Sequence, residues 1–137
     1  MANSAELMNR HGAVKLLYID DDVLGLKSLT VLMQTLGYQI ECAESAAAGL
    51  EMIRQEKYDL VLTDMNMPGM NGLRLTQEVK TIAPNTPVIV ITGSIDAQHS
   101  DQAVDGPDCV LVKPLDLQEF SGQLNRLLNR EPTRERH

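Results

Sequence analysis

The sequence is poor in aromatic residues and in cysteine, and both shortages limit the chemistry open to it. Its 137 residues include no tryptophan, one phenylalanine and three tyrosines. With so few rings available to stack on a flavin, an electron carrier built around that cofactor is disfavoured. The two cysteines, Cys42 and Cys109, each lie in an apolar stretch without metal-ligand spacing. We expect both to be buried small hydrophobic residues in a reducing, cytoplasmic setting.

Long hydrophobic runs and an excess of basic residues are also missing. No stretch approaches the roughly 18 apolar residues that a membrane span requires, and residues 1–12 lack the apolar core of a signal peptide. The 12 Lys and Arg residues are outnumbered by 19 Asp and Glu, which gives a formal net charge of −7. DNA and anionic membranes are bound through basic surfaces. We therefore expect neither direct nucleic-acid binding nor membrane association.

Short apolar runs alternate with helical patterns along the chain. Runs this short and this continuously apolar are typical of strands buried on both faces of a parallel sheet. Because helical segments separate them, the pattern predicts an α/β fold of five βα units, doubly wound around one parallel sheet. The five runs are Val14–Ile19, Tyr38–Ala43, Leu60–Thr63, Val88–Thr92 and Cys109–Val112.

Helix boundaries are signalled by capping residues and by helix breakers. In the first helix, Val23–Leu36, apolar residues recur at helical spacing, and Gly37 is expected to end it. Pro84 must end the third helix. The segment Ile95–Val104 carries few apolar residues and predicts a short or mobile fourth helix. The expected N-caps are Asp22, Ser45, Asn71 and Asp116.

The domain organisation that follows is simple. A flexible leader is expected over residues 1–13, one folded domain over residues 14–130, and a charged tail or the start of a linker over residues 131–137.

Residues able to do chemistry stand at the ends of four of these strands. The first strand is followed by Asp20, Asp21 and Asp22, and the third by Asp64. In a parallel sheet the strand ends meet at one edge, so the carboxylates would repel one another unless a cation lay among them. Hard carboxylate oxygens suit Mg²⁺. Thr92 and Lys113 add a hydroxyl donor and a positive charge, which together meet the needs of phosphoryl transfer.

Each of these residues also has an ordinary structural interpretation when taken alone. An Asp run before a helix is usually a solvated cap, and Asp64 could be a turn residue. A Thr at a strand end is usually structural, and a Lys before Pro usually lies at the surface. The four together at four strand ends favour the functional interpretation.

Four segments carry a resemblance to a known family. They are Leu-Tyr-Ile-Asp-Asp-Asp at 17–22, Asp-Met-Asn-Met-Pro-Gly-Met-Asn-Gly at 64–72, Ile-Thr-Gly at 91–93 and Val-Lys-Pro at 112–114. From Val14 to Leu128 the sequence resembles the receiver domains of two-component response regulators. The resemblance, rather than the pattern, implies a flavodoxin-like sheet with strand order 2-1-3-4-5.

The resemblance also assigns roles to individual residues. Asp64 would accept a phosphoryl group, and Mg²⁺ or Mn²⁺ would be held by Asp20, Asp21, Asp64 and the main-chain carbonyl of Asn66. Asp22 would serve as the helix cap. Thr92 and Lys113 would bond phosphoryl oxygens, with a cis peptide at Lys113–Pro114. Gly72 would free the loop backbone, while Asn66 and Ser94 would tune the lifetime of the acyl phosphate.

Partners follow from the same resemblance. A histidine kinase or phosphotransfer protein would donate the phosphoryl group, and an output domain or effector protein would receive the signal. A homodimer on activation is compatible with it. The chain would promote its own phosphorylation and slow dephosphorylation without being a turnover enzyme, because Asn66 stands where aspartyl-phosphate hydrolases carry a second acid.

Val110 departs from the family pattern, which places Tyr or Phe three residues before the conserved lysine. The usual switch rotates that ring as the threonine hydroxyl moves inward, and valine has no ring to rotate. One hypothesis is a smaller change carried by the loop after Thr92, where Gly93 adds backbone freedom. Another is that Val110 marks a constitutive interaction face. A pseudo-receiver that binds partners without phosphorylation is the alternative function.

Overall fold

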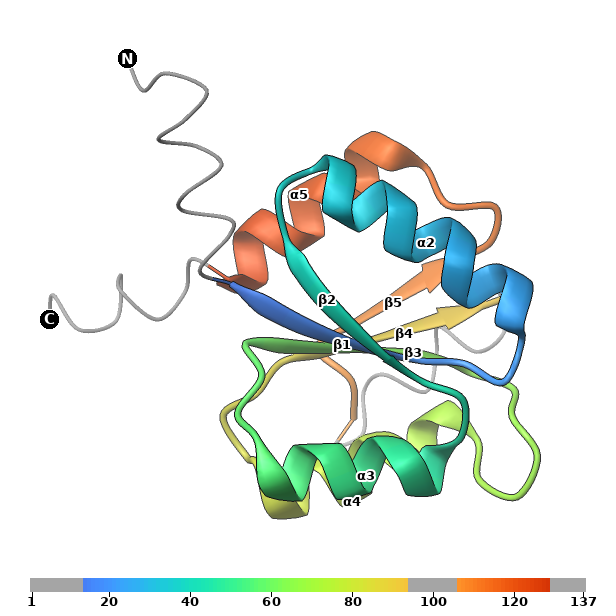
Figure 1. Cartoon of the computed structure of the whole chain (residues 1–137), viewed down its shortest axis with the longest axis vertical. Helices are drawn as coiled ribbons and strands as arrows, with labels where there is room; N and C mark the ends of the chain where they lie inside the picture. The colour runs from blue at the N-terminus through green and yellow to red at the C-terminus, as the bar shows by residue number, and fades with distance from the viewer. Residues whose placement is uncertain (1–13, 94–105, 129–137) are drawn as a thin grey trace, which may run out of the picture.

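The computed structural model describes residues 14–93 and 106–128, which form a five-stranded parallel sheet in the order β2-β1-β3-β4-β5 (Figure 1). The strand order and the (βα) alternation that we predicted are confirmed. Parallel pairing runs in register from Lys15 opposite Gln39 to Thr92 opposite Val112. The strands are β1 (Lys15–Ile19), β2 (Gln39–Ala43), β3 (Leu60–Asp64), β4 (Val88–Thr92) and β5 (Cys109–Val112).

Helices cover both faces of the sheet. Figure 1 shows α2 and α5 on one face and α3 and α4 on the other, so the domain has three layers. Each face has its own apolar core: Phe120 and Met33 lie in one, and Leu75 and Leu50 in the other. The helices are α2 (Val23–Thr35), α3 (Ala46–Gln55), α4 (Gly72–Ile82) and α5 (Leu117–Leu128).

Side-chain caps begin the helices, as the sequence predicted. Asp22 accepts a hydrogen bond from the Leu24 N–H at 3.1 Å, and Ser45 accepts one from the Ala48 N–H at 3.1 Å. Asn71 caps α4 in the same way. Helix α2 ends one residue earlier than we expected, with Gly37 at φ 96° just beyond it. A left-handed residue there satisfies the last carbonyls of the helix, which is the usual role of glycine at that position.

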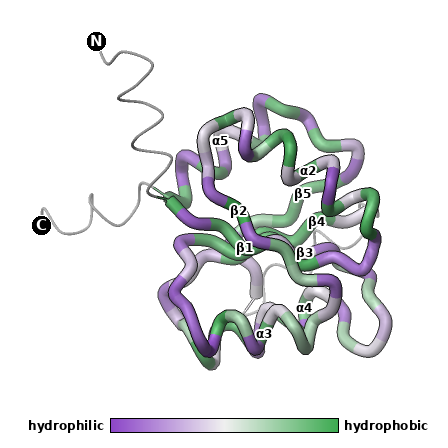
Figure 2. Tube along the Cα trace, in the orientation of Figure 1, coloured by the Kyte–Doolittle hydropathy of each residue, from purple (hydrophilic) through white to green (hydrophobic). Residues whose placement is uncertain are grey.

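The central strands are more deeply buried than the outer ones. All residues of β3 and β4 are buried, and Figure 2 shows mixed hydrophobic and hydrophilic stretches along the helices that cover the sheet. The expectation that every strand is buried on both faces is wrong for β2, because an edge strand has a neighbour on one side only. For the same reason Cys42 is exposed and Cys109 is half-buried, so the two cysteines are not the core residues that we predicted.

Helix α3 approaches β1 closely at a glycine. A Cβ atom at Gly49 would overlap the side chain of Ile19, whose Cγ1 atom would lie 2.7 Å away. Both residues are in the core between α3 and the sheet. Because Gly49 has no side chain, α3 can lie this close to β1, the strand that leads to Asp20.

A charged contact joins α4 to the starts of β4 and β5, at the opposite end of the sheet from the strand carboxyl ends. Lys80 Nζ lies 2.7 Å from Asp108 Oδ2 and donates to the carbonyl oxygen of Thr86 at 2.9 Å. The same Asp108 oxygen accepts the N–H of Val88 at 2.8 Å. This half-buried pair ties the end of α4 to the beginning of both β4 and β5.

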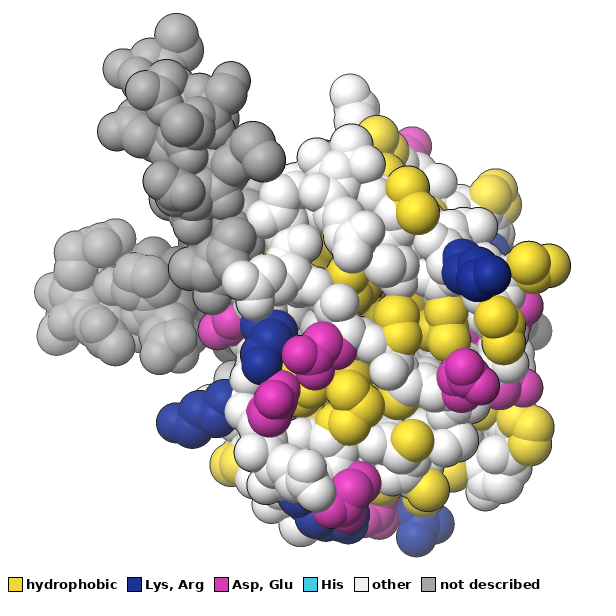
Figure 3. Space-filling model, viewed as in Figure 1, with side chains coloured by type: hydrophobic (Ala, Val, Ile, Leu, Met, Phe, Trp, Pro, Cys, Tyr) yellow, Lys and Arg dark blue, Asp and Glu magenta, His cyan; other side chains and the backbone are white. Residues whose placement is uncertain are grey.

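Within the described ranges, no helix combines the length and the apolar character needed to cross a membrane. Exposed apolar side chains gather over α2 and beside the edge strand (Figure 3). Leu24 is the most exposed of them, at 74%. The predicted leader, the predicted fourth helix at 95–104, Ser94 and the predicted tail lie outside the described residues.

The close approach at Gly49 leads to a test with an internal control. Gly49→Ala should destabilise the fold by about 1–3 kcal/mol, because the added methyl group overpacks the contact with Ile19. Gly122→Ala lies on the exposed side of α5 with open space around its Cβ position, and should stabilise by about 0.5–1 kcal/mol through reduced backbone entropy. Urea unfolding of both variants measures the two changes, and an equal response would show that Gly49 is not a packing requirement.

Candidate functional site

The carboxyl ends of the strands bring the predicted site residues to one edge of the sheet. Asp20 follows β1, Asp64 ends β3, and these strands are neighbours. One carboxylate oxygen from each of Asp20, Asp21 and Asp64 lies within 4.8 Å of the others. Three negative charges this close repel one another strongly unless cations offset them. The carboxylate cluster that the sequence predicted is therefore present, and its oxygens form a set that could hold a divalent cation.

Asp64 is held by a donor on each of its carboxylate oxygens. It is 7% exposed, and its Oδ1 atom lies 2.8 Å from the Nζ atom of Lys113. Its Oδ2 atom accepts the N–H of Asn66 at 3.0 Å. The Asp64 carboxylate raises the pKa of Lys113 by accepting this hydrogen bond. Both oxygens are thus fixed by donors, while the edge of the sheet leaves the group reachable from solvent.

Lys113 reaches Asp64 across the sheet from the end of β5, two strands away. Its peptide bond to Pro114 is cis, as the resemblance implied. The side chain of Lys113 is 48% exposed, so the ammonium group is bonded to Asp64 and yet open on its outer side. It is placed to meet a second anionic group that approaches Asp64 from solvent.

Asp20 is buried and receives two hydrogen bonds. The hydroxyl of Tyr18 donates to Oδ2 at 2.7 Å, and the N–H of Asp22 donates to Oδ1 at 3.0 Å. Burial raises the pKa of Asp20, the Tyr18 hydrogen bond opposes that rise, and the nearby Asp64 charge adds to it. Burial likewise raises the pKa of Tyr18. The hydroxyl therefore remains a donor that stabilises the Asp20 carboxylate.

Tyr18 is a site residue that our sequence reasoning missed. Its signal was present, because residues two apart on a strand face the same side, and Tyr18 precedes Asp20 by two. Gly25, in the first turns of α2, was missed as well. A Cβ atom there would lie 3.2 Å from carboxylate oxygens of both Asp20 and Asp22. The glycine lets the helix lie close to the acidic cluster.

Asp21 and Asp22 have different surroundings. Asp21 is exposed and belongs to the carboxylate cluster. Asp22 is the cap of α2, as predicted, and its Oδ1 atom is occupied by the Leu24 N–H. Asp21 thus belongs to the carboxylate cluster, whereas Asp22 caps the helix.

The loop after Asp64 is closed by a glycine whose role differs from our expectation. We predicted that Gly72 frees the backbone, yet it is the first residue of α4 and does not have a positive φ. A Cβ atom there would lie 2.8 Å from the carbonyl oxygen of Asp64. Its N–H also donates to the Met65 carbonyl at 2.7 Å. Gly72 therefore permits a close approach of α4 to the end of β3, and Gly69, at φ +84°, makes the turn.

The remaining predicted residues lie nearby, with one exception. Thr92 ends β4 and is fully buried. Val110 is 7% exposed and belongs to the core between the sheet and the α3–α4 layer. A buried valine does not present its side chain to a partner, which argues against the constitutive interaction face. Gly93 does not adopt a positive φ, and Ser94 lies outside the described residues.

A family model for the response regulator receiver domain matches residues 16–125. The chain belongs to this family. The transcriptional regulatory protein ZraR of Escherichia coli K12 is 31% identical over 119 residues, which are 86% of this chain and 27% of ZraR. GlrR of the same strain is 40% identical over 109 residues, which are 77% of this chain and 24% of GlrR. The receiver thus spans about a quarter of the length of these relatives.

Solved structures agree with this family assignment. A response regulator receiver domain protein of Clostridium thermocellum superimposes with a TM-score of 0.81 at 32% identity, covering 88% of this chain and 98% of that one. The response regulator TrrA of Thermotoga maritima, in complex with Mg²⁺–BeF, gives a TM-score of 0.77 at 28% identity, covering 84% and 99%. Fold and sequence thus identify this chain as a receiver domain.

The Tyr18 hydrogen bond can be tested directly. Tyr18→Phe should lower the free energy of unfolding by about 1–3 kcal/mol near neutral pH, because Asp20 loses a buried donor. The loss should shrink as the pH falls through the pKa of Asp20, since the neutral carboxyl needs that donor less. Urea unfolding across pH measures this dependence. The same substitution in an Asp20→Asn background is the control, and an equal, pH-independent cost in both backgrounds would rule out the charge-assisted bond.

Proposed function

We propose that this receiver domain accepts a phosphoryl group on Asp64 and works as a phosphorylation-controlled switch. The observation that supports it best is the position of Asp64 between the acidic cluster and the Lys113 ammonium, 2.8 Å from its carboxylate. Two anions, a carboxylate and a phosphoryl group, can react only where positive charge offsets their repulsion. Lys113 and a divalent cation would supply that charge from two sides. The proposed receiver unit extends over residues 14–130.

The proposed donor is a phosphohistidine of a histidine kinase or phosphotransfer protein. A carboxylate oxygen of Asp64 forms a bond to phosphorus while the bond from phosphorus to the imidazole nitrogen breaks. The electron pair of the broken bond stays on the imidazole nitrogen, and because the other ring nitrogen carries a proton, the histidine leaves as a neutral imidazole. The product is an acyl phosphate on Asp64, and water later cleaves it. No oxidant, reductant or further reactant is needed.

The chain's own residues orient and stabilise this transfer. The N–H of Asn66 fixes Oδ2 of Asp64, and Lys113 is placed to pair with an oxygen of the incoming phosphoryl group. Thr92, at the end of the neighbouring strand β4, would donate its hydroxyl to another oxygen. We propose that Asn66 and Ser94 tune the lifetime of the product. Because Val110 has no ring to rotate, the switch would differ from the aromatic one.

The proposed metal is Mg²⁺ or Mn²⁺. Asp20, Asp21 and Asp64 would hold it with the main-chain carbonyl of Asn66, and the cation would supply positive charge that offsets the repulsion between the carboxylate and the phosphoryl group. The donor set fits a hard divalent ion because it consists of oxygens. TrrA, whose structure contains Mg²⁺–BeF, supports the same choice by similarity.

The destination of the signal is an output domain or an effector protein. The similar proteins ZraR and GlrR are transcriptional regulatory proteins of which the receiver forms about a quarter. By similarity, we propose that phosphorylation of Asp64 changes the affinity of the domain for such a partner or for a second copy. The pseudo-receiver alternative is not favoured, because the acidic cluster, Asp64 and Lys113 are all brought together.

Phosphorylation is tested with a small acyl-phosphate donor and Mg²⁺. Intact-mass spectrometry should show one added phosphoryl group on the natural chain and none on Asp64→Asn. Asp22→Asn is a matched control, because asparagine keeps the helix cap and lies outside the carboxylate cluster; it should still gain the phosphoryl group. An adduct that persists in Asp64→Asn would place the acceptor elsewhere.

Metal binding is tested by following thermal unfolding as Mg²⁺ is added. A bound ion stabilises the native state, by about 2.7 kcal/mol at a concentration one hundred times the dissociation constant. Asp21→Ala should weaken this response and, without metal, should unfold at the same or a higher temperature, because one repelling charge is gone.

Asp22→Ser provides the comparison for that titration. Serine is a good N-cap, so this variant removes a neighbouring negative charge while keeping α2 intact. Its response to Mg²⁺ should remain close to that of the natural chain. If Asp22→Ser loses the response and Asp21→Ala keeps it, the ligand assignment is reversed.

A further inference from the structure

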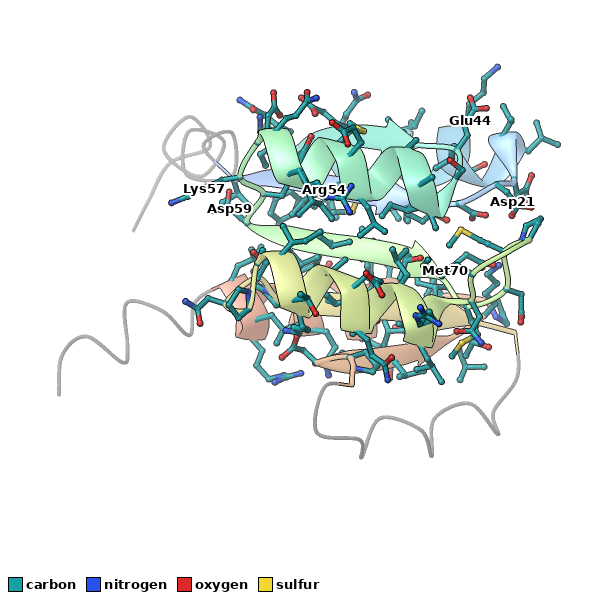
Figure 4. The ribbon with its side chains drawn as sticks, turned by 90° about the horizontal axis from the view of Figure 1, so that it is seen from below. Asp21, Glu44, Arg54, Lys57, Asp59 and Met70 are labelled. Atoms are coloured by element: carbon teal, nitrogen blue, oxygen red, sulfur yellow. The ribbon has the colours of Figure 1, made fainter. Side chains whose placement is uncertain are left out.

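A groove lies at the other end of the domain, where α3 and α4 both end. It has a volume of about 630 Å³. Its floor is apolar and includes Ile53, Val61 and Ile82, with Pro84 and Pro87 at one side. Figure 4 shows Arg54, Lys57 and Asp59 around this end, with Asp21 and Met70 at the far end of the molecule. The groove is therefore separate from the carboxylate site and plays no part in the proposed chemistry.

The charge at the groove favours an occupant with hydrogen-bond donors. Helix α3 ends at Gln55 and α4 at Ile82, and the last carbonyl groups of a helix lack intrahelical donors. Two helix C-terminal ends together carry partial negative charge. Glu56 and Asp59 stand at the rim beside Arg54 and Lys57, so the side-chain charges there balance and the helix ends carry the remaining partial negative charge. An occupant that suits this groove has apolar side chains for the floor and hydrogen-bond donors for the helix ends.

The chain enters the domain at the rim of this groove. The N–H of Lys15 donates to Asp59 Oδ2 at 2.8 Å, and the N–H of Asp59 donates back to the Lys15 carbonyl at 2.8 Å. The ammonium of Lys15 lies 2.7 Å from Glu56 and 5.2 Å from the ring centre of Tyr58. Asp59, Glu56 and Tyr58 all line the groove. Whatever precedes Val14 in the sequence is thus tethered next to it.

The thirteen residues before Val14 have the side chains that the groove calls for. Leu7 and Met8 form an apolar pair, and Arg10 and His11 follow them as donors. The seven residue-to-residue steps from Met8 to Lys15 can span about 23 Å when extended. Packed helices such as α3 and α4 have axes only about 8–10 Å apart. The apolar pair can therefore reach the floor while Arg10 reaches the helix ends.

We propose that the N-terminal segment 1–13 docks in this groove, with Leu7 and Met8 on its apolar floor and Arg10 at the helix C-termini. Docking would join the ends of α3 and α4 and shield half-buried Ile82 and exposed Pro84 from water. The segment after Leu128 is a poorer occupant, because α5 lies on the opposite face of the sheet (Figure 1). The proposal is independent of phosphorylation at Asp64.

The test places a nitroxide spin label beside the apolar pair. The label is attached at Asn9→Cys in a Cys42→Ser, Cys109→Ala background, which leaves Leu7 and Met8 intact. In a ¹⁵N-labelled full chain, the amide peaks of Arg54, Lys57 and Asn85 should lose intensity, and those of α2 and α5 should keep theirs. The same label combined with Leu7→Ser and Met8→Ser should restore the groove peaks. Ala2→Ser with Ala5→Ser, the control pair, should leave the loss unchanged.

Three outcomes would overturn the proposal. The first is full peak intensity at the groove with the label in place. The second is a loss that persists after Leu7→Ser and Met8→Ser, because tethering alone would then explain it. The third is a loss that also appears when unlabelled ¹⁵N chains are mixed with spin-labelled ¹⁴N chains, since the occupant would then be a second copy.

Discussion

Repulsion among like charges at one edge of the sheet is the constraint on which this structure depends. Parallel strands deliver Asp20 and Asp64 to the same place, and Asp21 joins them within 4.8 Å. The fold offsets that repulsion with fixed donors: Tyr18 on Asp20, and Lys113 and Asn66 on Asp64. These donors offset only part of the negative charge, and the remainder would attract a divalent cation. The cluster therefore keeps a net negative charge at this edge of the sheet, which is the condition that a divalent cation would meet.

Holding those charges in place is the work of the buried strands behind them. The residues of β3 and β4 are almost entirely without solvent contact, and close packing of this kind resists small displacements. The glycines at 49 and 72 bring helices to within van der Waals contact of β1 and of the end of β3. The buried strands and these close contacts together fix the positions of Asp20 and Asp64 from the side of the core.

Much of this arrangement could be predicted, because each prediction rested on a local rule. Apolar runs predicted the strands, and capping residues predicted where the helices begin. The parallel arrangement of the strands predicted that Asp20, Asp64, Thr92 and Lys113 converge at one edge. Features that depend on neighbours in space were harder to predict. Cys42 is exposed because its strand lies at the edge, and edge position comes from topology rather than from local composition.

Two kinds of feature were harder still to predict: a close approach that only glycine permits, and a hydrogen bond made by a single hydroxyl group. Gly72 is required by a close approach to the Asp64 carbonyl, and the sequence pattern alone suggested backbone freedom instead. In the sequence Tyr18 is one more residue of an apolar run, and only the structure shows its hydroxyl donating to Asp20. Val110 was recognised as unusual, yet its packing in the α3–α4 core could not be read from its position before Lys113.

The loop between Asp64 and α4 is fastened at both ends. The N–H of Met65 is bonded to the Ile91 carbonyl, and the N–H of Gly72 to the Met65 carbonyl, each at 2.7 Å. Between these anchors Asn66 donates its N–H to Asp64 at 3.0 Å, and exposed Pro68 and half-buried Met70 follow it in the loop. The loop is therefore held at its two ends and, through Asn66, at the Asp64 carboxylate itself.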